Sequence, residues 1–125
     1  MSARILIVED EQIVAADLEA KLKGMGHQVV GKAASGEEGI RLAGKLRPDL
    51  VLMDIRLQGE MDGTTAAGKI QELTNAPVIF LTAYAGVFLA NPAQMRPPGI
   101  CLSKPFSASQ LQAALETVIG DRRES

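Results

Sequence analysis

The sequence predicts an α/β fold, a doubly wound, five-stranded parallel sheet with helices on both faces. Three apolar runs lack the alternation of a half-exposed strand, which is typical of strands buried on both faces. These runs are residues 5–8, 50–53 and 78–81. Segments with helical spacing lie between them, and right-handed crossovers then place helices on both faces of the sheet.

The first helix is predicted by four apolar residues at the spacing of one helix face, namely Val14, Leu18, Leu22 and Met25. Glycines at positions 24 and 26 give this helix a C-terminal stop. A weaker strand is predicted at 28–31. Ser35 and Glu38 have the spacing of a capping box, so a second helix starts there and ends before Pro48.

The second half of the chain again alternates predicted strands and helices, with one exception. A third helix is expected at 64–73, with Ala66, Ile70 and Leu73 turned inward. Between 84 and 100, Pro92, Pro97 and Pro98 exclude a continuous helix, so the fourth helix is expected to be short or irregular. A weaker strand is predicted at 100–103. A capping box then opens the last helix, whose key residues are Ser107, Gln110, Leu111, Ala114, Leu115 and Val118.

Composition excludes several classes of protein. The 125 residues allow one domain, expected to span 1–125 with a core at about 4–120 and a tail at 121–125. A net charge of −2 leaves no basic surplus for nucleic acid, and a single cysteine excludes a disulfide framework. The main apolar runs are far shorter than a membrane span. We therefore expect a cytoplasmic protein that binds neither nucleic acid nor membrane directly.

Polar side chains follow four of the predicted strands. Glu9 and Asp10 follow the first, Asp54 the third, Thr82 the fourth and Lys104 the fifth. In a doubly wound sheet the ligand site lies outside the carboxyl ends of the strands, so these groups should converge. Clustered carboxylates with room for water suit Mg²⁺, and lysine and threonine suit phosphoryl oxygens. A carboxylate in such a site can act as a nucleophile and form an aspartyl phosphate.

These residues resemble the receiver domain of two-component response regulators, the chemotaxis-regulator (CheY-like) family, over residues 4 to about 120. The resemblance rests on the segments 7–11, 52–57, 78–84 and 102–106, in that order. It implies the flavodoxin-like strand order 2-1-3-4-5. It also implies that Asp54 is the phosphoacceptor, and that Mg²⁺ is held by Glu9, Asp10, Asp54 and the backbone carbonyl of Arg56.

The resemblance assigns two further residues to the phosphoryl group. Thr82 is expected to bind one oxygen and to change position on phosphorylation, while Lys104 pairs with another oxygen. The peptide bond between Lys104 and Pro105 is expected to be cis. The donor would be a phosphohistidine on a sensor histidine kinase or a histidine phosphotransfer protein, and the output partner is unidentified. Such a domain is no turnover enzyme, since it catalyses only its own phosphotransfer and dephosphorylation; a homodimer is left open.

The chain departs from the family pattern in three places, one of which is the loop after Asp54, one residue longer than the commonest form and without its usual proline. Glu9 stands where aspartate is frequent, and Cys101 occupies the position of the aromatic ring that takes part in the switch. Cys101 itself is expected to be a small buried strand residue. One alternative is therefore a constitutive docking domain, a pseudo-receiver with little or no phosphotransfer. Another is a Mg²⁺-dependent phosphohydrolase, but that class needs an acid two residues after its nucleophile, where this chain has Arg56.

Overall fold

The apolar runs of the sequence form a parallel sheet in a computed structural model that describes residues 2–55, 57, 61–82, 100–104 and 106–124. The sheet order is β2-β1-β3-β4-β5, with every neighbouring pair parallel, which confirms the expected topology. The strands are β1 (Arg4–Val8), β2 (Gln28–Ala33), β3 (Leu50–Asp54), β4 (Val78–Thr82) and β5 (Ile100–Ser103).

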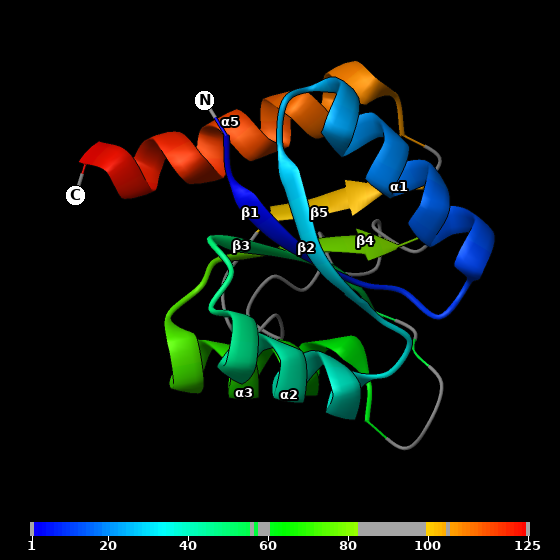
Figure 1. Ribbon diagram of the computed structural model, residues 1–125, viewed down its shortest axis with the longest axis vertical. Coiled ribbons are helices and arrows are strands. Elements are labelled where there is room, and N and C mark those ends of the chain that lie inside the picture. The colour runs from blue at the N-terminus through cyan, green and yellow to red at the C-terminus, as the bar shows by residue number, and fades with distance from the viewer. Residues whose placement is uncertain (1, 56, 58–60, 83–99, 105, 125) are drawn as a thin grey trace.

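Helices cover both faces of this sheet (Figure 1), as the sequence predicts. One face is packed by α2 (Gly36–Leu46) and α3 (Gly63–Thr74), and the other by α1 (Gln12–Gly24) and α5 (Ala108–Glu124). Among the described residues, no helix is long and apolar enough to cross a membrane. The prediction of a short fourth helix concerns residues 84–99, which lie outside the described residues.

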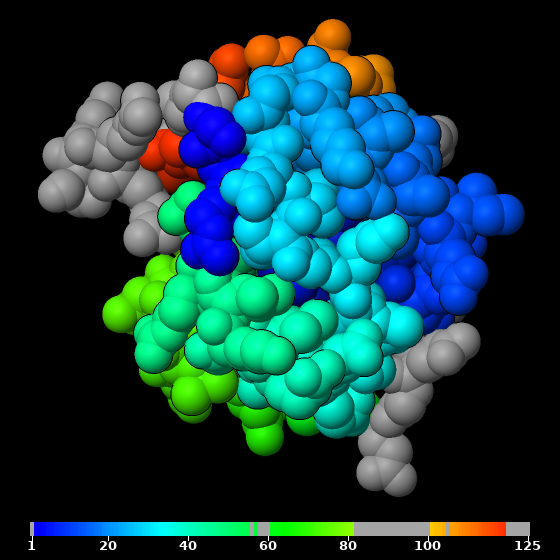
Figure 2. Space-filling view, in the orientation of Figure 1, coloured from blue at the N-terminus to red at the C-terminus, as the bar shows by residue number. Residues whose placement is uncertain are grey.

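Successive side chains of a buried strand pack into the cores on opposite faces of the sheet. In β1, Leu6 and Val8 belong to the core on the α2 and α3 side, whereas Ile5 and Ile7 belong to the core on the α1 and α5 side. All five residues of β3 are buried. Figure 2 shows α1, β2 and α2 closing over β1, of which only the N-terminal end reaches the surface on this side. Apolar runs without alternation are the consequence of this two-sided burial.

Both predicted capping serines cap their helices, but only the box at α5 is complete, because the Glu38 side chain at α2 accepts from the Ala34 amide at 3.0 Å and not from that of Ser35. The Ser35 hydroxyl accepts a hydrogen bond from the Glu38 amide at 3.2 Å, and α2 ends at Leu46, before Pro48. At the start of α5 the exchange is reciprocal, because Ser107 and Gln110 each accept the other's backbone N–H, at 3.1 and 2.8 Å. These contacts satisfy amides that a helix leaves unpaired in its first turn.

The inward placement predicted for Leu73 is wrong. Leu73 is 53% exposed, while Ala66 and Ile70, predicted to share its face, are fully buried. A helix turns about 100° per residue, so Leu73 is rotated about 60° from Ile70 toward the edge of the buried stripe. It also lies in the last turn, since α3 ends at Thr74. The regular apolar spacing therefore continues past the point where α3 stops packing against the core.

Candidate functional site

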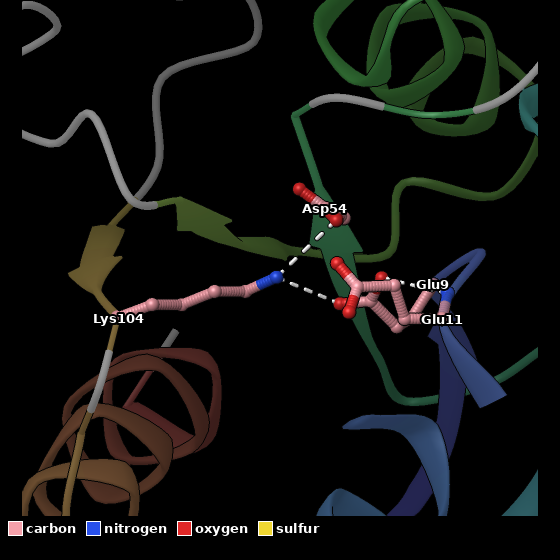
Figure 3. A network of polar contacts seen from close by, with 4 residues as sticks. All are labelled: Glu9, Glu11, Asp54 and Lys104. Carbon is pink, nitrogen blue, oxygen red and sulfur yellow. Dashed lines mark hydrogen bonds and ion pairs between the residues drawn. The ribbon is translucent and has the colours of Figure 1, made fainter. Parts of the chain in front are cut away.

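Three strands deliver charged side chains to one edge of the sheet. Glu9 directly follows β1, Asp54 is the last residue of β3, and Lys104 directly follows β5. The strands are parallel, so all three residues lie at the same edge, and Figure 3 shows the Lys104 side chain extending toward both carboxylates. The structure therefore brings Lys104 to residues that are 95 and 50 positions away in the sequence.

Lys104 bridges the two buried carboxylates. Its Nζ donates to Glu9 Oε1 at 2.8 Å and to Asp54 Oδ2 at 3.2 Å. The Glu9 side chain is 0% exposed, and its second oxygen, Oε2, accepts the backbone N–H of Glu11 at 3.1 Å. Asp54 is also buried, with 8% of its side chain exposed. Buried charges persist when they are paired and hydrogen-bonded, as these are.

This pairing keeps Lys104 charged. Burial by itself would lower the pKa of the ammonium, but the hydrogen bond to Glu9 and the negative charges of Asp54 and Glu9 outweigh it and raise the pKa above its usual value. Glu9 also raises the pKa of Asp10, where a higher pKa favours the neutral form of the side chain. Burial raises the pKa of this carboxyl, and the hydrogen bond and negative charge of Glu9 raise it further. A backbone hydrogen bond and the positive charge of Lys104 lower it by less.

The donor set fits a hard divalent cation. Glu9, Asp10 and Asp54 each offer a carboxylate oxygen, and these oxygens all lie within 4.8 Å of one another. Three carboxylates against one ammonium leave two negative charges, which a divalent cation would neutralise. Oxygen ligands in small number, with Asp10 open to solvent on one side, suit Mg²⁺, which retains several of its waters.

Gly63, the first residue of α3, packs against the backbone of Asp54. The Gly63 N–H donates to the Ile55 carbonyl at 2.8 Å, and a Cβ at Gly63 would lie 2.2 Å from the Asp54 carbonyl oxygen. Asp62 precedes it and caps α3, where the hydrogen bond from the Thr65 amide holds the pKa of its carboxyl below the usual value. The sequence signal was the Asp-Gly pair, which indicates a turn but not this contact.

The remaining predicted residues are placed only in part. The backbone of Thr82 ends β4 and pairs in register with Ser103, but its side chain lies outside the described residues. Arg56 and Pro105, with the expected carbonyl ligand and cis peptide bond, also lie outside them. Cys101 is partly buried and packs against the core on the α2 and α3 side, where burial raises the pKa of its thiol.

Sequence comparison identifies relatives along nearly the whole chain. The profile of the response regulator receiver domain family matches residues 5–116. The phyllosphere-induced regulator PhyR of Methylorubrum extorquens is 37% identical over 120 residues, which are 95% of this chain and 44% of that protein. The chain thus spans about half the length of the curated relatives it matches.

Solved structures agree with this match. The signal receiver domain of a modulated diguanylate cyclase from Desulfovibrio desulfuricans superposes with a TM-score of 0.88 at 36% identity, covering 98% of both chains. The receiver domain of the sensor histidine kinase PA1611 from Pseudomonas aeruginosa superposes with a TM-score of 0.80 at 34% identity, covering 96% of this chain and 99% of that one. In that structure a magnesium ion is coordinated in the active site cleft.

Proposed function

Because this chain belongs to the response regulator receiver domain family, we propose that Asp54 accepts a phosphoryl group from a phosphohistidine donor in a two-component phosphorelay. The observation that carries the proposal is the buried bridge in which Lys104 joins Asp54 to Glu9, beside Asp10. The donor would be a sensor histidine kinase or a histidine phosphotransfer protein. Phosphorylation would then change how the domain binds an output partner.

The transfer is a single displacement at phosphorus. An Asp54 carboxylate oxygen attacks the phosphorus atom, a P–O bond forms, and the P–N bond breaks with its electron pair passing to the donor imidazole. Lys104, whose Nζ lies 3.2 Å from Asp54 Oδ2, is placed to pair with a phosphoryl oxygen. Glu9, Asp10 and Asp54 are the residues that would hold Mg²⁺. When bound, the cation neutralises charge on the phosphoryl oxygens.

The domain is proposed to act as a switch and not as a turnover enzyme. A phosphohydrolase of the aspartyl-phosphate class uses a second acid two residues after its nucleophile, and that position is Arg56 here. Without this acid, the aspartyl phosphate is hydrolysed only by the domain's own dephosphorylation, a slower reaction than that of a phosphohydrolase with the acid. A phosphoryl group that contacts Thr82 and Lys104 differently in two conformations would shift the equilibrium between them.

Beryllofluoride, a phosphoryl mimic, tests the proposal without a donor protein. Added with Mg²⁺, it should shift the backbone NMR signals of the strand ends β1, β3 and β5 and raise the thermal midpoint, because a ligand that binds only the folded state stabilises it. The Asp54→Asn variant is the control and should not respond. If the wild-type domain is also unresponsive while Mg²⁺ is present, the domain is a constitutive docking module and the proposal fails.

A further inference from the structure

Met61 directly precedes the N-terminal cap of α3 and packs against the core on the α2 and α3 side. The cap is Asp62, whose Oδ1 accepts the Thr65 amide at 2.8 Å. An apolar residue before a cap often packs against the fourth residue of the helix, and this hydrophobic staple fixes the angle at which the chain enters the helix. The fourth residue of α3 is Ala66, which is fully buried. Met61 and Ala66 therefore have the spacing of a hydrophobic staple.

The two staple residues, Met61 and Ala66, contact α2 at its first residue, Gly36. A Cβ placed on Gly36 would lie 3.1 Å from the Ala66 Cβ and 3.2 Å from the Met61 Sδ. Both side chains thus approach the space that a larger residue at position 36 would fill. Because that residue is glycine, the staple rests directly on the first turn of α2.

The first turn of α2 is also fixed to the backbone that carries Glu9. A Cβ placed on Gly39, three residues further along α2, would lie 3.0 Å from the Cγ2 of Val8, and Val8 directly precedes Glu9. The Glu9 amide donates to the Ala33 carbonyl at 2.8 Å, at the end of β2. One turn of helix therefore contacts both the strand that leads to Glu9 and the staple that leads to Gly63.

The start of α3 is in turn held on the backbone of Asp54. The Gly63 N–H donates to the Ile55 carbonyl at 2.8 Å, and a Cβ on Gly63 would lie 2.2 Å from the Asp54 carbonyl oxygen. If the first turn of α3 moved away from α2, this hydrogen bond would lengthen and Asp54 would be free to move relative to Glu9. The acids Glu9, Asp10 and Asp54 offer oxygens within 4.8 Å of one another. Mg²⁺ requires near-octahedral geometry with bonds of about 2.0–2.1 Å, so such a movement should weaken its binding.

We propose that Met61 is a positioning residue for Asp54. Its side chain closes the staple on Gly36, the staple sets the start of α3, and Gly63 transmits that position to the backbone of Asp54. Met61 acts through Gly63 and not by contact with the cation or the phosphoryl group. This inference rests on the proposed Mg²⁺ site and adds to it the contact that keeps Asp54 at the distance from Glu9 that the cation requires.

Substitutions at two methionines test the proposal. Met61→Ala removes the side chain that reaches Gly36, whereas Met61→Leu keeps an apolar side chain of similar volume and should restore the wild-type behaviour. Met25→Ala is the matched control, because Met25 is also partly buried but packs against the core on the α1 and α5 side. Each variant is first shown to be folded by thermal unfolding, and Met61→Val, a smaller truncation, takes the place of Met61→Ala if that variant does not fold.

The first readout is the NMR scalar coupling across the hydrogen bond from the Gly63 nitrogen to the Ile55 carbonyl carbon. It reports the geometry of the folded domain and requires neither a cation nor a phosphoryl group. We expect the coupling to be at least about twofold smaller in Met61→Ala, because hydrogen bonds weaken steeply when they are distorted. It should keep its wild-type value in Met61→Leu and in Met25→Ala.

The second readout is the affinity for Mg²⁺, followed by the amide signals at the ends of β1 and β3 during a titration with MgCl₂. We expect the affinity to fall about tenfold in Met61→Ala, the lower end of the loss of about 10- to 100-fold that is typical when a residue that orients metal ligands is replaced. It should keep its wild-type value in Met61→Leu and in Met25→Ala.

The outcomes distinguish this inference from the proposed function on which it rests. Losses of coupling and of affinity in Met61→Ala alone, both restored in Met61→Leu, support the positioning role. Wild-type affinity in Met61→Ala, or an equal loss in Met25→Ala, overturns that role while the proposed cation site stands. A wild-type domain that binds no Mg²⁺ at millimolar concentration refutes the cation site and overturns the inference with it.

Discussion

Replacing Gly63 with alanine would drive a methyl group into the backbone that carries the proposed phosphoacceptor. The new Cβ would lie 2.2 Å from the Asp54 carbonyl oxygen and 2.8 Å from the Ile55 Cα, whereas ordinary contacts begin at 3.4 Å. The atoms struck belong to the main chain at the end of a buried strand, so no side chain can rotate away. The start of α3 must shift away from the end of β3 by more than about 1 Å, because close-packed interiors do not absorb such overlap.

Two costs add to the expected loss of stability. Overpacking a well-packed site costs about 1–3 kcal/mol, and the shift stretches the hydrogen bond from Gly63 N to the Ile55 carbonyl, worth about 1 kcal/mol more. That bond is 2.8 Å long in the native domain. We therefore expect Gly63→Ala to lower the free energy of unfolding by about 2–4 kcal/mol.

Urea unfolding followed by circular dichroism measures this change, with Gly44→Ala as the matched control. Gly44 is exposed in α2, and a Cβ there would meet nothing within 4 Å. Alanine at that helical position should instead stabilise the domain by about 0.5–1 kcal/mol. A Gly63→Ala domain as stable as the wild type would refute the steric reasoning, because the close approach would then be dispensable.

Two further predictions concern a buried stripe and a histidine. Ile70→Ala should cost about 2–5 kcal/mol in urea unfolding and Leu73→Ala about 0.5 kcal/mol or less, because Ile70 is fully buried and Leu73 is 53% exposed; equal losses would contradict the described packing of α3. His27 Nδ1 accepts the Ala3 N–H at 3.1 Å, and burial, followed by the positive charge of the N-terminus, lowers the pKa of the imidazole below 6.5. The unfolded chain therefore binds more protons, so the stability that the neutral ring provides is complete above about pH 6.5 and is lost as the pH falls below it. Relative to His27→Asn, which keeps an acceptor and cannot titrate, the wild type should lose stability between about pH 7 and pH 5, and parallel pH profiles would contradict this.

The sheet was largely predictable because burial on both faces leaves a direct trace in the sequence. The apolar runs at 5–8, 50–53 and 78–81 became the three central strands, and the structure extends them by one residue at one end each. Capping boxes located the starts of α2 and α5, since the pairing of Ser35 with Glu38 and of Ser107 with Gln110 is local. The prediction that Leu73 is buried failed for a different reason. Apolar spacing indicates which face of a helix turns toward the core, but not where along the helix the contact with the core ends.

The site was predictable in its members but not in its contacts. Position at the strand ends was enough to bring Glu9, Asp54 and Lys104 together. The sequence did not indicate that Lys104 would lie closer to Glu9 than to Asp54, because that depends on side-chain length across the sheet. Nor did it indicate the approach of Gly63 to the Asp54 backbone, which depends on how closely α3 begins against the end of β3.

The central claim, that Asp54 accepts a phosphoryl group, is tested most directly by mass spectrometry of the domain treated with acetyl phosphate and Mg²⁺. The account predicts a mass increase of one phosphoryl group, located on the peptide that contains Asp54, and no increase in Asp54→Asn or when EDTA replaces Mg²⁺. A wild-type domain of unchanged mass, or one in which Asp54→Asn is labelled as well as the wild type, would contradict it.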